Sequence, residues 1–344
     1  LEHPMANYAI LVAIINYPGL RDLSGPENDL EDFREWLIAA DGGNLPTTNV
    51  SVIKSSNFPP VNDPAAANPT EAAFKEALKK LVFNTDGTFR GHTGERLYLY
   101  FAGHGFDGRR LAEAALYTAN ATRNDCDHIA SKRYAERIAN SRTFDEVVLV
   151  MDCCRDIDLS DSIRDPVLKL PDRAAIDSPA RVFEAYAAGR GQQARERPIP
   201  PGGKVRGLFS YAFVDALRNA RGDVKGNVTG TILKGHILDR WPQLFDGQAP
   251  YDPDIYPPGG SDIVFVRRPV SPGVKVSFTL KPPQPPVGTM IVIENPPGTE
   301  VKRVPFDPAG TRTSLPDSIY KARLDTTTRS AYIDAAGASV EVDL

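Results

Sequence analysis

Residues 95–105 read Glu-Arg-Leu-Tyr-Leu-Tyr-Phe-Ala-Gly-His-Gly, and residues 146–155 read Glu-Val-Val-Leu-Val-Met-Asp-Cys-Cys-Arg. Each stretch is a nearly continuous apolar run, which is the pattern of a strand covered on both faces. Each run ends in residues that can do chemistry, a histidine between two glycines in the first and a pair of cysteines in the second. Ligands of open parallel sheets bind beyond the carboxyl ends of the strands. We therefore expect His104 and Cys154 to meet at one edge of a sheet.

Apolar runs and amphipathic segments alternate on both sides of these two strands. Further strands are predicted at residues 8–16, 50–54 and 180–188, with a closing strand at 262–266. Helices are predicted where apolar residues recur at helical spacing, namely after Pro26, after Thr70 and over residues 208–219. This alternation predicts an α/β fold with a mostly parallel sheet flanked by helices.

The sequence changes character after Val266. Proline-rich stretches then separate short alternating runs at residues 274–280, 289–294 and 339–344. This pattern predicts a small all-β module over residues 268–344, and the α/β domain is expected over residues 5–267. Residues 1–4 precede the first methionine and are expected to be a remnant of expression.

Composition and charge narrow the class of partner. The 344 residues carry a formal net charge of −4, which gives no electrostatic footprint for nucleic acid. No apolar run approaches the ~20 residues that a membrane span requires. We therefore expect a protein or peptide partner, with no nucleic acid and no membrane.

The cysteines predict a reducing compartment. There are three, Cys126, Cys153 and Cys154, and neighbouring cysteines seldom bridge each other because the ring is strained. An odd count without a disulfide framework favours a cytoplasmic protein with at least one free thiol. The stretch Asp125-Cys126-Asp127-His128 mixes hard and soft ligands at adjacent positions, whereas metal sites space their ligands, so no metal site is assigned.

His104 and Cys154 have the chemistry of a catalytic dyad. A free thiol, with a pKa near 8.5, is only slightly ionised at neutral pH, so it needs a base. An imidazole can take the proton from the thiol and later return it to the leaving amine. Backbone N–H groups of the loops can stabilise the oxyanion, and Gly105 and Cys154 are the candidates. We therefore predict His104 as the general base and Cys154 as the nucleophile.

A strand ending in His-Gly, followed about 50 residues later by a strand ending in Asp-x-Cys, resembles the caspase and metacaspase family of cysteine peptidases. Over residues 8–267, three further segments resemble that family in order: Leu23-x-Gly25-x-x-Asn28-Asp29, Ala187-Ala188-Gly189-x-x-Gln192-x-Ala194-x-Glu196 and Gly207-Leu208-Phe209-Ser210-Tyr211-Ala212. The Asp-x-Cys spacing selects Cys154, and strand alternation turns Cys153 toward the packed side. The chain departs from the family in Arg155-Asp156, which puts a charged residue beside the nucleophile.

The resemblance implies an endopeptidase that cleaves proteins after basic residues. In metacaspase-like members, carboxylates at the positions of Asp29 and Asp152 line the first specificity pocket (S1) and bind a basic side chain. Arginine is favoured over lysine because it pairs bidentately with carboxylates. No cofactor is implied. Calcium activates some metacaspases, but no calcium ligands are assigned here.

The polar stretch between Arg155 and Arg181 is predicted to be a functional loop, because it is long for a plain connection. Four of its basic residues are candidate sites of self-cleavage or of an activating protease: Arg164, Lys169, Arg173 and Arg181. The resemblance also implies a bacterial regulatory, cell-death or defence pathway.

Two other hypotheses compete with an active peptidase. A catalytically silent caspase-like scaffold would bind a regulatory partner through its C-terminal β module, but it has no need of both His104 and Cys154. A nucleotide-binding doubly wound domain is disfavoured, because Tyr17-Pro18-Gly19-Leu20 stands where a glycine-rich phosphate loop would follow the first strand.

Overall fold

The computed structural model describes residues 6–108, 113–157, 163–173, 178–199, 203–269, 273–295, 298–316, 318–335 and 339–344. The chain divides into two compact units, Leu1–Arg218 with Leu233–Ile263, and Asn219–Ile232 with Val264–Leu344. The smaller unit thus takes in a segment that precedes the predicted boundary at residue 268, and that boundary stays a prediction.

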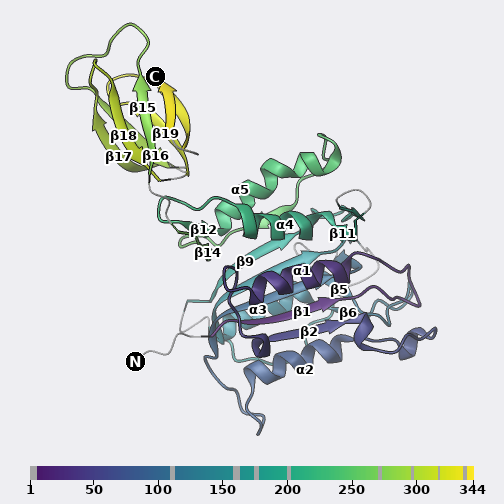
Figure 1. Cartoon of the computed structure of the whole chain (residues 1–344). Coiled ribbons are helices and arrows are strands. Elements are labelled where there is room, and N and C mark those ends of the chain that lie inside the picture. Colours follow the sequence, from purple (N-terminus) through teal and green to yellow (C-terminus); the bar gives the residue numbers. More distant parts are fainter. Residues whose placement is uncertain are drawn as a thin grey trace. The chain divides into compact units, whose positions relative to one another are not determined.

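The larger unit is built on a six-stranded sheet in the order β13-β9-β7-β3-β1-β2, of which Figure 1 labels β9, β1 and β2. Its strands are β1 (Tyr8–Ala13), β2 (Val50–Lys54), β3 (Gly94–Ala102), β7 (Phe144–Asp152), β9 (Arg181–Tyr186) and β13 (Asp254–Tyr256). Neighbouring strands run parallel except β13, which pairs antiparallel with β9. The predicted α/β fold with a mostly parallel sheet is confirmed.

The strand that closes this sheet is not the one predicted at residues 262–266. That segment forms β14 (Val264–Arg267), which pairs with β12 (Asn227–Thr229) in a separate two-stranded sheet. The edge strand β13 has three residues, of which only Ile255 is buried. The prediction was wrong because an apolar run indicates a strand without saying which strand it pairs with, and β13 is too short to show such a run.

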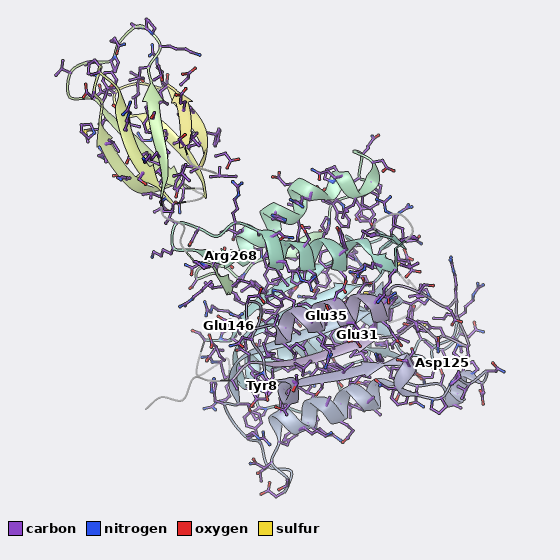
Figure 2. The ribbon with its side chains drawn as sticks, viewed as in Figure 1. Tyr8, Glu31, Glu35, Asp125, Glu146 and Arg268 are labelled. Carbon is purple, nitrogen blue, oxygen red and sulfur yellow. The ribbon has the colours of Figure 1, made fainter. Side chains whose placement is uncertain are left out.

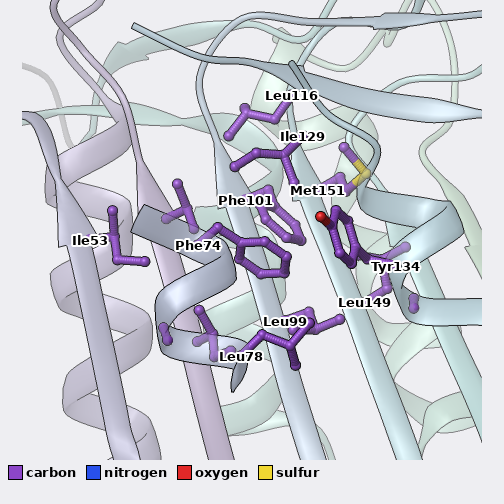
Figure 3. Packing of buried hydrophobic residues seen from close by; sticks show 14 of the residues in the cluster. Ile53, Phe74, Leu78, Leu99, Phe101, Leu116, Ile129, Tyr134, Leu149 and Met151 are labelled. Carbon is purple, nitrogen blue, oxygen red and sulfur yellow. The ribbon is translucent and has the colours of Figure 1, made fainter. Parts of the chain in front are cut away.

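Helices α2 (Glu71–Val82) and α3 (Ser131–Ser141) cover one face of the sheet. Figure 3 shows Phe74 of α2 and Tyr134 of α3 packed against alternate residues of the central strands, among them Phe101 and Met151. The rings of Phe74 and Phe101 lie 5.4 Å apart. Each such buried side chain contributes about 1.5–3 kcal/mol, which makes the central strands a rigid support.

The opposite face is covered by α1 (Pro26–Ile38) and α4 (Leu208–Asn219). Phe33 of α1 lies 5.3 Å from the ring of Tyr100 in β3 and 5.8 Å from the ring of Phe213 in α4. Tyr100 and Phe101 therefore point to opposite faces, as successive residues of a strand do. The two faces together bury the central strands on both sides, as their apolar sequence predicts.

A second sheet lies beyond the ends of the central strands. It has the order β6-β5-β4-β8, with β4 (Gly105–Asp107), β5 (Ala114–Tyr117), β6 (His128–Ile129) and β8 (Asp156–Ile157). Because β4 starts after His104 and β8 starts after Arg155, their pairing joins the chain segments that follow the two catalytic candidates. Strands of two to four residues carry too few apolar positions to be predicted from sequence.

The remaining elements are a hairpin of the strands β10 and β11 and several short helices. They are β10 (Glu196–Pro198), β11 (Val205–Gly207), α5 (Gly230–Arg240) and the 3-10 helices η1 (Thr47–Asn49), η2 (Ser55–Asn57), η3 (Pro64–Ala66) and η4 (Trp241–Phe245). Among the residues that the structure describes, no helix combines the length and the apolar character needed to cross a membrane.

The C-terminal strands form two sheets, in the orders β18-β15-β21 and β17-β16-β19-β20. The strands are β15 (Val274–Thr279), β16 (Met290–Asn295), β17 (Thr299–Pro305), β18 (Thr311–Leu315), β19 (Ser318–Leu324), β20 (Ser330–Ala335) and β21 (Ser339–Asp343). Buried side chains from both sheets, such as Val276, Ile291 and Ile333, make a separate core. The predicted all-β module is confirmed, with four strands that the proline-rich sequence did not reveal.

Candidate active site

His104 and Cys154 follow neighbouring parallel strands that end at the same level. Ala102 and Asp152 are the last paired residues of β3 and β7, and His104 and Cys154 each come two residues later. Both line one cavity of about 950 Å³. In Figure 2, Tyr8 and Glu146, near the starts of β1 and β7, lie at one end of the sheet, and Asp125, two residues after the cavity-lining Arg123, lies toward the other. The cavity thus lies beyond the carboxyl ends of the strands.

The His104 ring is held by its neighbours in a defined orientation. His104 Nε2 lies 2.6 Å from the Arg21 carbonyl oxygen, which can only accept, so Nε2 carries the proton and Nδ1 is left as the base. The His104 backbone N–H donates to the Tyr17 hydroxyl at 3.0 Å, and the two rings lie 4.8 Å apart. The preceding Gly103 has φ +153°, and a Cβ there would lie 2.5 Å from that hydroxyl. Glycine is therefore required before the histidine.

The two adjacent cysteines have different surroundings. Cys154 is half-buried, lines the cavity and has its Sγ 3.9 Å from the Ala194 carbonyl oxygen. Cys153 is buried in the core, and its Sγ occupies the space that a side chain on Gly105 would need. Burial raises the pKa of Cys154 to about 11 and that of Cys153 well above its usual value. Of the pair, only Cys154 lines the cavity, and its thiol is protonated at rest.

Asp29 and Asp152 come together at the amino end of α4. Asp29 Oδ2 accepts the Gly207 N–H at 2.8 Å, and Asp152 Oδ2 accepts the Ser210 N–H at 2.9 Å. Burial, followed by the nearby charge of Asp152, raises the pKa of Asp29 well above its usual value. Burial raises the pKa of Asp152 to about 6. Two buried carboxyls that repel each other need a cation before both can ionise.

One carboxylate oxygen of this pair lacks a hydrogen-bond partner in the described part of the chain. Asp29 Oδ1 is buried and has no hydrogen-bond partner among the described residues. Asp29 Oδ2 and Asp152 Oδ2 have a structural role, because they accept the N–H groups of Gly207 and Ser210 at the start of α4. These bonds do not explain why Asp29 Oδ1 is buried without a partner. Because Asp29 lines the cavity, a donor that enters from the cavity would satisfy this oxygen.

Glu196 is a third carboxylate on the cavity, and its sequence position alone did not predict a role for it. Its Oε2 accepts the Gly25 N–H at 2.8 Å, and its Oε1 accepts the Ser24 N–H at 3.3 Å. The charge of Glu196 helps to raise the pKa of both Asp29 and Asp152. In the sequence, Glu196 stood out only as part of a segment that resembles the family. That segment could not show that β10, which begins at Glu196, lies beside the loop before α1.

Arg155 is the charged residue expected beside the nucleophile, and the structure shows that its charge is paired. Its guanidinium is buried and forms ion pairs with Asp107 at 2.7 Å and Asp254 at 2.9 Å. It also stacks over the Tyr186 ring, 4.5 Å from the centroid. The Arg155 N–H donates to the Gln192 carbonyl at 2.9 Å. Arg155 thus anchors the segment after Cys154 to β4, to β13 and to the loop that follows β9.

The candidate processing sites differ in accessibility. Arg164 is exposed and forms an ion pair with Asp127. Lys169 and Arg173 are also exposed. Arg181 lies in β9 of the central sheet, which makes it the least accessible of the four. Residues 158–162 and 174–177 of this loop lie outside the described residues.

The Asp125–His128 stretch is engaged in local contacts. His128 Nδ1 donates to the Cys126 carbonyl at 2.6 Å, and Nε2 accepts the Arg164 N–H at 3.0 Å. Both ring nitrogens are therefore occupied. Within the described ranges, no three or more His, Cys, Asp or Glu side chains are grouped so that they could hold a metal ion.

Comparison with known proteins gives matches of three kinds. A family model described as the caspase domain matches residues 6–231. Over 252 residues the chain is 26% identical to a protein of a Desulfuromonadales bacterium named as a probable protease, a match that covers 70% of this chain but only 29% of that protein. The crystal structure of caspase-1 from Spodoptera frugiperda matches with a TM-score of 0.47 at 14% identity, covering 77% of this chain and 92% of that chain.

Proposed function

The chain belongs to the caspase family, and from this premise we propose that it is a cysteine endopeptidase with Cys154 as nucleophile and His104 as general base. The observation that carries the proposal is the shared cavity beyond β3 and β7, which both residues line. The bond from Nε2 to the Arg21 carbonyl supports the role of His104, because it leaves Nδ1 free to take a proton.

The reaction proceeds through a thioester. Cys154 Sγ attacks the peptide carbonyl carbon while its proton passes to His104 Nδ1, since a thiol with a pKa of about 11 does not ionise beforehand at neutral pH. The C–N bond then breaks, and the amine leaves with the proton from the imidazolium. Water attacks the thioester and gives a proton to Nδ1. The C–S bond breaks, the acid product leaves and the thiolate regains its proton.

Backbone N–H groups of Gly105 and Cys154 are proposed to bind the oxyanion. The Tyr117 N–H donates to the His104 carbonyl at 2.9 Å, and Gly105 pairs with Leu116 in the same antiparallel ladder. In such a ladder, pairs that exchange backbone hydrogen bonds alternate with pairs that do not. Because His104 and Tyr117 form a hydrogen-bonded pair, Gly105 and Leu116 do not, and the Gly105 N–H points away from β5. Gly105 also lines the cavity, which supports its role as a donor.

The carboxylate group at Asp29, Asp152 and Glu196 is proposed as the S1 pocket for a basic side chain. Two observations support this role: Asp29 Oδ1 has no partner among the described residues, and the pKa values of both aspartates are raised. An entering cation would donate to this oxygen and would favour the ionised form of both carboxyls. A guanidinium presents several donors in one plane and can bond more than one carboxylate, so arginine is preferred over lysine.

Cleavage within the 155–181 loop is proposed as an activation step, with the exposed Arg164, Lys169 and Arg173 as the leading sites. The reaction needs no cofactor, because the thiol and the imidazole supply the nucleophile and the proton carrier. Activation by calcium stays a prediction that chelation would test. The three free cysteines favour the cytoplasm, and a bacterial regulatory, cell-death or defence pathway is the proposed setting.

Fluorogenic peptides that differ only in the residue before the scissile bond test this function. Turnover should be highest after arginine and lower after lysine. It should fall roughly 10⁴-fold or more in Cys154→Ala, whereas the matched variant Cys153→Ala should remain active. Cleavage only after aspartate would refute the S1 pocket but spare the dyad. Absence of turnover under every condition of calcium and processing would favour the silent scaffold.

A further inference from the structure

Three arginines line the cavity, Arg21, Arg123 and Arg195, and the first two lie in loops beside His104. Arg21 and Arg123 are both exposed on the cavity wall. Neither guanidinium has an ion-pair or hydrogen-bond partner among the described residues. Arg195 is also exposed, but it directly precedes Glu196 of the S1 pocket, whereas Arg164, outside the cavity lining, is paired with Asp127. Unpaired cations on the wall of a binding cavity attract anionic groups of a ligand.

The loops that carry these arginines contact each other beside His104. Gly19 forms a parallel bridge with Thr122, and a Cβ on Gly19 would lie 2.6 Å from the Ala121 carbonyl oxygen. Arg21 and Arg123 follow these bridged residues by two positions and one position. The Arg21 carbonyl is also the group that holds His104 Nε2, at 2.6 Å. The two cations therefore belong to the wall that supports the general base.

The S1 aspartates have other charged neighbours. The charges that act most strongly on Asp29 come from Asp152, Arg206 and Glu196, and neither Arg21 nor Arg123 is among them. The cavity thus has an anionic part at α4 and a cationic part beside His104. Such a division fits a ligand that carries a positive and a negative side chain at neighbouring positions.

We propose that Arg21 and Arg123 form a subsite for an acidic side chain on the residue directly after the scissile bond. The inference rests on the proposed peptidase function. The leaving amine takes its proton from His104, so the residue that bears this amine must lie next to the imidazole. The wall beside the imidazole is the loop whose carbonyl binds its Nε2, together with the loop bridged to it. A basic residue followed by an acidic one is therefore the preferred cleavage sequence.

The chain itself holds one such sequence among the candidate processing sites. Asp165 follows Arg164, whereas Leu170 follows Lys169 and the residues after Arg173 and Arg181 are apolar. Both Arg164 and Asp165 are exposed. The subsite thus selects the Arg164–Asp165 bond from the proposed processing sites.

Two measurements on one peptide series test the subsite. The peptides contain arginine followed by glutamate, glutamine or lysine. Values of kcat/KM are measured with the wild type, and dissociation constants by fluorescence anisotropy with Cys154→Ala. The glutamate peptide should be preferred over the glutamine peptide roughly three- to tenfold, and the lysine peptide should be poorest. The preference should shrink as salt is raised, because exposed charges are screened.

Variants locate the preference. Arg123→Gln should lower the glutamate-to-glutamine ratio, and the double variant with Arg21→Gln should bring it within about twofold of unity. Arg34→Gln is the charge-matched control, since Arg34 lies on α1 and is not part of the cavity lining, and it should keep the ratio. Equal rates and equal dissociation constants for the glutamate and glutamine peptides would overturn the subsite even if arginine peptides are cleaved.

Failure of the proposed function gives a different result. If no peptide is hydrolysed, the anisotropy ratio still decides the matter: a glutamate preference lost in the double variant supports the subsite, and its absence overturns it. A preference that persists in the double variant also overturns the assignment, because other groups would then carry it.

Discussion

Asp152 illustrates, at the scale of one residue, how a binding group can lower the stability of the fold. Its carboxyl is buried and its pKa is raised to about 6. A carboxyl whose pKa is higher in the folded than in the unfolded chain destabilises the fold as pH rises from the unfolded to the folded value. At neutral pH the ionised form therefore acts against folding, and a bound cation offsets that effect.

Replacing Asp152 with asparagine should stabilise the protein at neutral pH. The amide oxygen of Asp152→Asn can still accept the Ser210 N–H, while the cost of ionisation, on the order of 3 kcal/mol, disappears. Thermal unfolding at pH 7 should shift upward by several degrees. The shift should vanish below about pH 4, where the wild-type carboxyl is protonated in both states. Activity on arginine peptides should fall, and a variant that is less stable at both pH values would contradict this account.

The residues of the site were only partly predictable from sequence. His104 and Cys154 follow from apolar strands that end in reactive side chains, a local signal. Asp29 and Asp152 were named only through the family resemblance. The contact of Glu196 with the loop before α1, and the burial of the Arg155 guanidinium, depend on partners far along the chain. No periodicity in the sequence encodes such contacts.

At the scale of elements, length decides what the sequence predicts. The bounds predicted for β2 and α4 are those observed, Val50–Lys54 and Leu208–Asn219, because apolar residues repeat over the whole of each element. The short strands β4, β8 and β13 lack such a repeat. They are nevertheless the elements that fix the segments after His104 and Cys154, and Arg155 is the side chain that connects β4 with β13.

Removing the Arg155 cation should destabilise the larger unit. Arg155→Met leaves Asp107, which is fully buried, without its ion-pair partner. The expected loss is about 3–5 kcal/mol in the free energy of unfolding, measured by denaturant titration. Arg155→Met combined with Asp107→Asn should recover most of the loss, because no uncompensated charge remains. A loss below about 1 kcal/mol in the single variant would show that the ion pair does not hold these strands together.

The 155–181 loop carries a prediction of its own. Intact mass measurement of active enzyme should reveal a fragment that begins at Asp165, absent in Cys154→Ala. Asp165→Asn should slow this cleavage several-fold if the acidic side chain is recognised. The same change also removes the ion pair between Asp165 and Arg133, whose charged atoms lie 2.7 Å apart. Loss of this ion pair would loosen the loop and so would not slow cleavage.

Arg133→Gln separates these two effects on the loop. It breaks the same ion pair and leaves Asp165 intact, so cleavage should be at least as fast as in the wild type. Slower cleavage in Asp165→Asn together with unchanged or faster cleavage in Arg133→Gln would support recognition of the aspartate. A fragment that begins after Lys169 or Arg173 would refute the choice of this bond.

At the scale of the whole molecule, all the cavity-lining residues belong to the larger unit. The C-terminal strands have a hydrophobic core of their own, to which no residue of the cavity contributes. A separate core of this kind is what an independently folding module requires. The chemistry is therefore expected to be independent of β15–β21, and docking of a regulatory protein stays a proposal for that module.

A chain ending at Pro269 tests this independence. The cut keeps β14 paired with β12, and keeps the bond of the Arg268 N–H to the Gly226 carbonyl at 2.8 Å. Val224, which packs against the removed core, is changed to serine to avoid an exposed apolar side chain. The value of kcat/KM for arginine peptides should stay within about twofold of the full chain. A chain ending at Ile263 is the matched control, since it loses β14 and should be less stable. If the chain ending at Pro269 folds, as judged by circular dichroism, but is inactive, the β module takes part in catalysis and the larger unit does not act alone.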